Sequence, residues 1–338
     1  MRPGAPFWVL FRWAPMGPVL LICLLALIAA AGCGDDDDGS GERGSSGRND
    51  IRIEFAMVGI PGDPFYNVIK NGARQAKDDL GVDVAYKETS QYDFQEQKRL
   101  IEAAIARKPD GLVISDESPD VLDPVIADAV DAGIPVVIAN AMGPDTLETT
   151  GALGFVGQDE FEVGKLAGER MKAAGVATAF CVNPAVGSVP LDLRCRGLAE
   201  ALGDGNTKVV ATTVDDRTAS KNRMKAALQR QDVDGMLVTA ATVNGAQALQ
   251  AVEETGKGGE VKIASIDLTP DVLQAVKDRK IIFTSDQQQY LQGYLPVQIL
   301  TLYHEYGLRP QPLTKTGPAY ITADNAEQAI ELSKRGIR

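Results

Sequence analysis

The stretch that decides the fold is IRIEFAMVGIPGDPFYNVIKNGARQAKDDLGVDVAYKE, residues 51–88. An apolar run at 51–60 predicts a strand, an amphipathic segment after Asp63 predicts a helix, and 82–88 predicts a second strand. Asp63 before Pro64 is typical of a helix start, because aspartate caps free backbone N–H groups and proline lacks one. A strand, a helix and a strand in this order predict one unit of a parallel sheet.

The same alternation continues to residue 286. Asp159 and Glu160 place negative charge at the start of the helix that runs to Ala174, and helix 95–108 stops before Pro109, as a following proline requires. The fold class is therefore α/β, and a five-plus-five grouping of strands predicts two doubly wound parallel-sheet lobes with a ligand cleft between them. The other predicted strands are 111–115, 134–140, 153–157, 177–183, 207–213, 235–240, 261–267 and 281–286.

The first 32 residues have the composition of an export signal. Arg2 and Arg12 precede an apolar run at 19–31 that is short for a membrane span. The sequence Ala-Ala-Gly-Cys at 30–33 resembles a bacterial lipobox, in which the cysteine becomes the first mature residue and carries acyl chains. Cleavage as an ordinary secretory peptide is the alternative.

Residues 33–50 contain little but Gly, Ser and charged side chains, which is the composition of a flexible linker. A folded domain held by acyl chains needs such a spacer. We therefore expect an exported protein that is lipid-anchored through Cys33 to the outer face of the bacterial cytoplasmic membrane, with no other membrane segment.

Charge and cysteine content agree with export. Removal of residues 1–32 takes away two of the 34 basic residues and none of the 46 acidic ones, so the mature chain is more acidic still. Such a chain should not bind nucleic acid. With Cys33 lipidated, Cys181 and Cys195 remain as a pair in a compartment where disulfides persist, so we expect a bond between them. Two free buried thiols are the alternative.

The sequence lacks the motifs that usually accompany enzymes on such sheets. It contains no glycine-rich nucleotide loop after the first strand, no Walker loop and no nucleophile elbow. His304 is the one histidine of the chain, which disfavours a metal site. We expect no enzymatic activity, no metal and no cofactor.

Polar and aromatic residues recur where the predicted strands end, at the edge where open parallel sheets bind ligands. Aromatic faces, carboxylates, amides and one arginine together suit a polyhydroxylated ligand, because they stack on its C–H patches and exchange hydrogen bonds with its hydroxyls. Each residue also has a purely structural interpretation; Asp63, for instance, is a helix cap in its own right. The candidate ligand residues are Asp63, Phe65, Tyr66, Gln91, Asn140, Arg194, Asp215, Asp267 and Gln287.

From Ile51 to its end the chain resembles the sugar-binding proteins of ABC importers of the ribose and galactose type. The resemblance rests on GDPFYNVIKNGARQAKDDLGV (62–82), VGQDEFEVGKLAGERM (156–171), LRCRGLAEAL (193–202), IASIDLTPDVLQAVKDRK (263–280) and DQQQYLQG (286–293). It implies a type I periplasmic binding protein, in which two lobes joined by three hinge segments close over one sugar and then dock on a membrane permease.

The resemblance also implies the lobe boundaries. The N-terminal lobe would comprise 51–155 and 287–314, and the C-terminal lobe 156–286 and 315–338. The hinge would run through 155–157, 285–287 and 313–316, after which a short strand and a helix return to the second lobe. We expect a monomer, since the sequence shows no heptad seam.

Carried over by position, Phe65 and Tyr66 resemble the stacking aromatics of the first lobe. Arg194, Asp267 and Gln287 resemble the sugar-contacting arginine, aspartate and hinge glutamine. Asn140-Ala141 stands where ribose-type proteins have Asp-Arg, Asp215 replaces an aromatic residue, and Ala241, flanked by Thr239 and Thr242, replaces an asparagine. These departures predict a pentose, a short sugar or an open-chain sugar alcohol in preference to a hexopyranose.

The pair Cys181 and Cys195 is a further departure from the family pattern, and a bond there would stiffen the approach of Arg194 to the ligand.

Three other functions compete with import. A transcription regulator on this fold is set aside because the chain has an export signal in place of a DNA-binding motif. A sensor that feeds a signalling receptor, for a sugar or a quorum signal, and an enzyme of unknown type on the same scaffold stay open.

Overall fold

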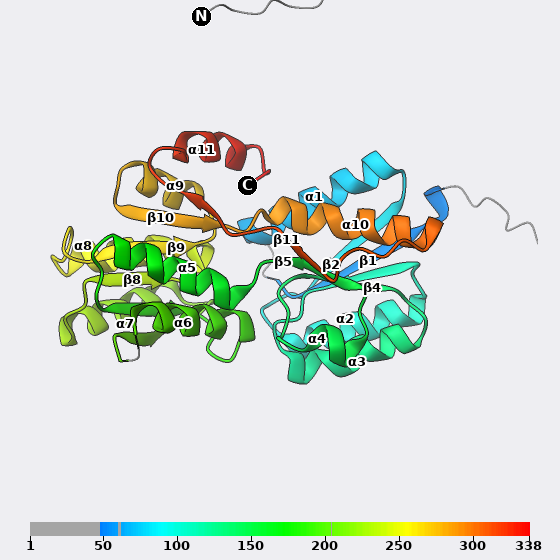
Figure 1. Cartoon of the computed structure of the whole chain (residues 1–338), viewed down its shortest axis with the longest axis horizontal. Helices are drawn as coiled ribbons and strands as arrows, with labels where there is room; N and C mark the ends of the chain where they lie inside the picture. Colours follow the sequence, from blue (N-terminus) through cyan, green and yellow to red (C-terminus); the bar gives the residue numbers. More distant parts are fainter. Residues whose placement is uncertain (1–47, 60–61, 204) are drawn as a thin grey trace, which may run out of the picture. The chain divides into compact units, whose positions relative to one another are not determined.

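The computed structural model describes residues 48–59, 62–203 and 205–338, all within one compact unit of residues 46–338. The predicted signal peptide, Cys33 and most of the predicted linker lie outside the described residues. The described chain forms two six-stranded sheets (Figure 1). Each sheet and the helices that cover it make up one lobe, and we call the two the N-terminal and the C-terminal lobe. No helix in this described part is long and apolar enough to cross a membrane.

The N-terminal lobe is built on a sheet with the strand order β11-β5-β4-β3-β1-β2. A short 3₁₀ turn at Arg48–Asp50 precedes the first strand. The strands are β1 (Arg52–Met57), β2 (Asp83–Glu88), β3 (Gly111–Ile114), β4 (Val136–Asn140), β5 (Gly154–Gly157) and β11 (Leu313–Lys315). The helices are α1 (Pro64–Leu80), α2 (Phe94–Arg107), α3 (Pro119–Asp131), α4 (Thr146–Thr150) and α10 (Gln289–Tyr306).

The C-terminal lobe repeats this plan with the strand order β12-β10-β9-β8-β6-β7. The strands are β6 (Ala179–Asn183), β7 (Thr207–Ala211), β8 (Gly235–Val238), β9 (Lys262–Ile266), β10 (Ile281–Asp286) and β12 (Ala319–Ile321). The helices are α5 (Glu160–Ala173), α6 (Val189–Leu202), α7 (Arg217–Arg230), α8 (Ala241–Glu254), α9 (Pro270–Lys277) and α11 (Ala326–Lys334).

All ten strands predicted from the sequence are present, and they pair in parallel within each sheet. Two further strands complete the sheets: β11 pairs in parallel with β5, and β12 pairs antiparallel with β10. The predicted fold class of two doubly wound α/β lobes is confirmed. The predicted helix cap is also present, since Asp63 Oδ1 accepts from the N–H of Phe65 at 2.9 Å.

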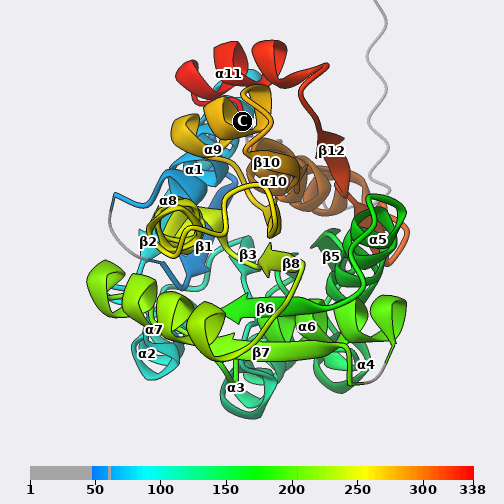
Figure 2. The same ribbon diagram turned by 90° about the vertical axis from the view of Figure 1, so that its left-hand side faces the viewer.

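Each sheet is covered by helices on both faces, so each lobe has two hydrophobic cores (Figures 1 and 2). In the N-terminal lobe α1 and α10 cover one face and α2 and α3 the other. In the C-terminal lobe α5 and α6 cover one face, and α7, α8, α9 and α11 cover the other. Burial on both faces explains why the central strands are almost continuously apolar in sequence.

The chain passes between the two sheets three times: from β5 to α5, from β10 to α10, and from β11 to β12. β5 stays in the first sheet as far as Gly157 and β11 as far as Lys315. Gly157 lies two residues beyond the lobe boundary predicted at 155, and Lys315 lies one residue beyond the boundary predicted at 314.

The helix that follows each of the first two crossings packs very closely on the helix that follows the first strand of the lobe it enters. In the C-terminal lobe α5 meets α6 at two glycines: a Cβ on Gly164 would overlap the carbonyl of Arg194, and one on Gly197 that of Phe161. In the N-terminal lobe α10 meets α1 in the same way, through Gly293 and Gly72. Glycine is required at these crossings because only backbone fits there.

We predict that Gly72→Ala destabilises the protein, because its methyl group would overlap the carbonyl oxygen of Tyr290 in α10. Overpacking of this kind should lower the free energy of unfolding by about 1–3 kcal/mol, measured by urea denaturation. Gly258→Ala is the matched control, since a Cβ there meets nothing within 4 Å. Equal stability of the two variants would contradict the packing described here.

Candidate ligand site

A cavity of about 70 Å³ lies between the two lobes, at the carboxyl ends of their strands. Its walls come from the segments that follow β1, β2, β3 and β4 of the N-terminal lobe and β6, β7, β8, β9 and β10 of the C-terminal lobe, including the N-terminal parts of α1, α6 and α8. The lining residues are Asp63, Phe65, Tyr66, Tyr92, Glu117, Asn140, Ala141, Pro184, Pro190, Leu191, Arg194, Val214, Ala240, Thr242, Val243, Asp267 and Gln287.

Seven of the nine residues predicted from the sequence line this cavity: Asp63, Phe65, Tyr66, Asn140, Arg194, Asp267 and Gln287. Gln91 and Asp215 do not line it and are exposed. Their neighbours Tyr92 and Val214 take the places on the wall. Consecutive side chains of an extended segment point in opposite directions, and the phase of that alternation in a loop is not evident from sequence.

Phe65 and Tyr66 form the aromatic wall. They lie in the first turn of α1, with ring centroids 5.1 Å apart and planes at 76°. The Asp63 cap fixes this turn, and burial raises the pKa of the Asp63 carboxyl, while the hydrogen bond from the Phe65 N–H lowers it in part. Both residues line the cavity, and aromatic rings suit the C–H patches of a small ring or chain.

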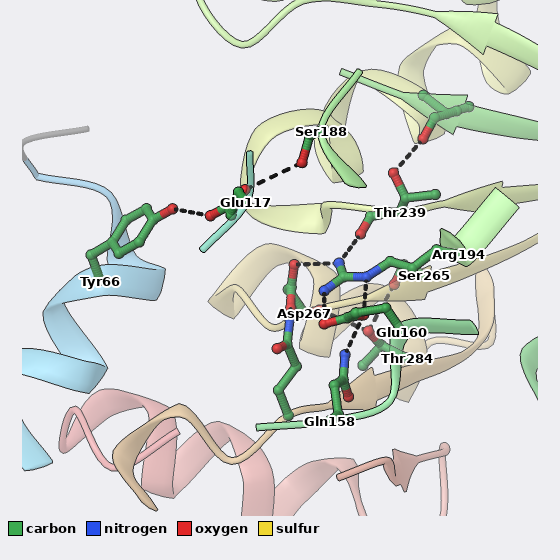
Figure 3. A network of polar contacts seen from close by, with 12 residues as sticks. Tyr66, Glu117, Gln158, Glu160, Ser188, Arg194, Thr239, Ser265, Asp267 and Thr284 are labelled. Atoms are coloured by element: carbon green, nitrogen blue, oxygen red, sulfur yellow. Dashed lines mark hydrogen bonds and ion pairs between the residues drawn. The ribbon is translucent and has the colours of Figure 1, made fainter. Parts of the chain in front are cut away.

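Glu117, in the loop between β3 and α3, was not predicted as a site residue. Its carboxylate accepts hydrogen bonds from the hydroxyl groups of Tyr66 at 3.4 Å and of Ser188 at 3.3 Å (Figure 3). The Tyr92 hydroxyl also donates to it. Burial raises the pKa of Glu117, and the hydrogen bond from Tyr92 and the charge of Arg194 oppose that rise. Its position two residues after the predicted strand 111–115 was the one sequence signal available for it.

Arg194 enters the cavity wall from α6, where it is almost fully buried. Its Nε and Nη2 donate to the two carboxylate oxygens of Glu160 at 2.6 and 3.0 Å, and Nη1 donates to the Thr239 carbonyl at 2.5 Å (Figure 3). Glu160 also accepts from the Gln158 side chain at 3.1 Å. Since a guanidinium has five N–H donors, two remain for a ligand.

The charge state of Arg194 follows from these neighbours. Burial alone would lower the pKa of Arg194, but the charges of Glu160 and Asp267 raise it above its ordinary value. The Asp267 carboxylate lies 3.7 Å from Nη1, beyond hydrogen-bond distance. The guanidinium is therefore a fixed cation that is preorganised within the C-terminal lobe.

Asn140 and Asp267 occupy equivalent places, at the end of the fourth strand of each lobe. Both have a left-handed backbone, with φ of 70° and 78°, which Asn and Asp tolerate better than most residues. Gln287, at the second crossing, donates to Asp267 Oδ1. Burial raises the pKa of Asp267 to about 7, against the lowering influence of Arg194 and of this hydrogen bond.

Comparison with known proteins fits this arrangement. Residues 55–305 match the family model described as "Periplasmic binding protein domain". The chain belongs to the periplasmic binding protein family. Within it, the sequence and the two-lobed fold are those of the type I, ribose and galactose branch, as the sequence motifs indicated.

Three relatives illustrate the likeness. A solved carbohydrate transporter from Acidothermus cellulolyticus, in complex with myo-inositol, is 31% identical with a TM-score of 0.79, covering 86% of this chain and all of that one. A xylose/arabinose-binding protein of Sulfolobus acidocaldarius is 29% identical, over 69% of this chain and 62% of its own length. A xylitol-binding protein of Mycolicibacterium smegmatis is 28% identical, over 71% of this chain and 68% of its own length.

The chain thus spans less than two thirds of the length of the xylose/arabinose-binding relative. The relatives are named as binding proteins, which agrees with the expectation that this family member is not an enzyme. Among the described residues no group of three or more His, Cys, Asp or Glu side chains is arranged to hold a metal ion. The predicted bond between Cys181 and Cys195 is present and joins β6 to α6.

We predict that Glu160→Gln destabilises the fold, because it removes the carboxylate that is hydrogen-bonded to the buried guanidinium of Arg194 and leaves only the more distant charge of Asp267. Loss of one partner of a buried pair should lower the free energy of unfolding by about 3 kcal/mol or more, measured by urea denaturation at neutral pH. Glu331→Gln is the control, since Glu331 pairs with Lys334 at the surface and should show no measurable change. A loss of the same size in both variants would contradict a specific role of the buried pair.

Proposed function

We propose that the protein is the extracytoplasmic solute-binding component of an ABC importer and captures a small sugar or sugar alcohol between its lobes. The observation that carries this proposal is the cavity between the lobes, to which both lobes contribute hydrogen-bonding groups beside an aromatic pair. Membership of the periplasmic binding protein family supports it. The same family membership favours a binding protein over an enzyme.

The polar groups of the cavity suit a neutral polyol. Asp63 and Asp267 offer carboxylate oxygens to ligand hydroxyls, and Arg194 offers the two N–H groups that remain free of Glu160 and Thr239. The Glu117 carboxylate also lines the cavity, but its oxygens already accept from Tyr66, Tyr92 and Ser188. The amide of Asn140 both donates and accepts. Three carboxylates beside one already paired guanidinium disfavour an anionic ligand such as a sugar phosphate.

The size of the cavity favours a small ligand. A single water molecule needs about 10–15 Å³ on the same measure, so about 70 Å³ holds a compact molecule of a few carbon atoms. Ala141 places a methyl group on the wall where ribose-type proteins have arginine. We therefore propose a pentose, a short sugar or an open-chain sugar alcohol in preference to a hexopyranose; the names of the xylose/arabinose-binding and xylitol-binding relatives support that class.

Capture would proceed by closure about the three crossings, at 155–157, 285–287 and 313–316. The lobe formed by 51–155 and 287–314 would rotate against the lobe formed by 156–286 and 315–338. A ligand stabilises the closed form because contacts from both lobes are available only there. The permease would recognise the closed monomer, held at the outer face of the membrane through a lipid on Cys33.

We predict that a pentose or a sugar alcohol raises the melting temperature of residues 46–338 more than a hexose does. A ligand that binds only the native state must stabilise it, and the measurement is a thermal-shift screen of pentoses, hexoses, tetritols, pentitols and inositols. Sugar phosphates are the negative controls and should give no shift. Tight binding of glucose or galactose with no response to xylitol, threitol or the pentoses would contradict the proposed ligand class.

Variants connect the screen to the cavity. Asp267→Asn should reduce the shift, whereas Gln91→Ala and Asp215→Ala should not, because these two side chains do not line the cavity.

Uptake of the same labelled sugar by whole cells separates an importer from a sensor. Loss of uptake on deletion of the gene supports import, and unchanged uptake with a lost transcriptional response supports the sensor.

We predict that the disulfide tightens ligand binding by stiffening the helix that carries Arg194. Cys181→Ala with Cys195→Ala should raise the Kd measured by calorimetry severalfold, well below the melting temperature. The same double variant should lose about 3 kcal/mol of stability, the value typical of a loop of this length. If stability falls and the Kd is unchanged, the bond serves stability alone.

A further inference from the structure

The N-terminus of α6 is incomplete within its own lobe. The first N–H groups of any helix have no intrahelical acceptor, and a serine at the N-cap normally accepts one of them. Ser188 is the N-cap of α6 but makes no such bond. Pro190, in the first turn, has no N–H to satisfy, so the N–H groups of Val189 and Leu191 are the donors left without an intrahelical acceptor at this end.

The other lobe supplies the missing partner. The Val189 N–H donates to the backbone carbonyl of Glu117 at 3.2 Å, and the Ser188 hydroxyl donates to the Glu117 carboxylate at 3.3 Å (Figure 3). The Tyr92 hydroxyl, also of the N-terminal lobe, lies 3.3 Å from Ser188 Oγ. A buried carboxylate at a helix N-terminus is also favoured by the helix dipole.

The loop before α6 is held in place by its own helix. Asp192 accepts from the Asn183 side chain at 2.8 Å and from the Gly187 N–H at 3.0 Å. Ser188 and Val189 are thus positioned within the C-terminal lobe, independently of Glu117. Ser188 does not line the cavity, although it is buried.

We propose that Glu117 is an inter-lobe latch, which completes the N-terminus of α6 through Ser188 and Val189 only when the lobes are closed. Opening the cleft exposes the Val189 N–H and separates Glu117 from Ser188, so these bonds oppose opening without touching the ligand. Glu117 and Ser188 thereby act as positioning residues for the closed state. The inference rests on the proposed capture of a sugar or polyol by closure and specifies what holds the closed form.

Two variants remove the latch from the side that does not line the cavity. Ser188→Ala deletes the hydroxyl; its helix should keep its stability because this serine makes no cap bond. Val189→Pro deletes the N–H, and proline is well tolerated at the first helical position. The matched controls are Ser118→Ala, an N-cap of α3 that also makes no side-chain cap bond, and Val189→Ala, which keeps the N–H.

The first measurement is stopped-flow kinetics with the sugar or polyol that gives the largest thermal shift. Loss of a buried hydrogen bond to a charged group should increase the dissociation rate about tenfold in Ser188→Ala, with the association rate changed less than about twofold. Val189→Pro should show the same pattern to a smaller extent, and both controls should match wild type. A change in association rate alone, or unchanged dissociation rates in both latch variants, would overturn the latch.

The second measurement needs no ligand. Ala103 in α2 and Gln229 in α7 are exposed. Spin labels attached to the variants Ala103→Cys and Gln229→Cys report the distance between the lobes by pulsed electron paramagnetic resonance. The latch predicts longer distances in Ser188→Ala than in wild type, and an identical distribution argues against it. If no carbohydrate binds the wild type, the proposed function fails while this measurement still decides the latch.

Discussion

The buried pair between Arg194 and Glu160 is the interaction on which the ligand site depends. Two charges removed from water are costly unless each is fully hydrogen-bonded. The protein meets this requirement by bringing α5 and α6 together at Gly164 and Gly197, so that the carboxylate reaches the guanidinium with both oxygens. The Thr239 carbonyl completes the arrangement. The packing of α5 on α6 thus sets the direction of the two Arg194 N–H groups that Glu160 and Thr239 do not accept from.

The same construction occurs twice in the molecule. In each lobe, the helix that follows a crossing packs through a pair of glycines on the helix that follows the first strand. Asn140 and Asp267 repeat the pattern at the strand ends, with the same left-handed backbone. One lobe, however, ends its fourth strand with an amide and the other with a carboxylate. The scaffold is therefore nearly symmetric, while the chemistry of its two walls is not.

Local pattern was sufficient to predict much of this structure. Strands buried on both faces are continuous apolar runs, and Asp63 with Pro64 marks a helix start by itself, so ten strands and the first helix were evident from sequence. The pairing of Cys181 with Cys195 followed from counting and from the compartment. The seven predicted side chains that line the cavity were found because parallel sheets bring their strand ends to one edge.

The remaining site features depend on tertiary contacts that no local pattern encodes. Glu160 has the position of an ordinary helix-start charge, and only the packing of α5 on α6 makes it the partner of Arg194. Glu117 and Tyr92 contact Ser188 of the other lobe, although they lie 71 and 96 residues from it in the sequence. Gln91 and Asp215 were preferred over their neighbours on residue type, whereas the phase of the loop decides which side chain faces inward.

Two of the three chain crossings lead directly into the site: Glu160 follows the first and holds Arg194, and Gln287 forms the second and donates to Asp267. In the proposed closure, the segments that bend are therefore also the segments that hold charges of the cavity wall. A substitution of these residues that changes the ligand specificity would therefore also alter the closing motion of the lobes. Substitutions that change ligand specificity should instead accumulate on the lobe walls away from the crossings, at lining positions such as Asn140, Ala141 and Thr242.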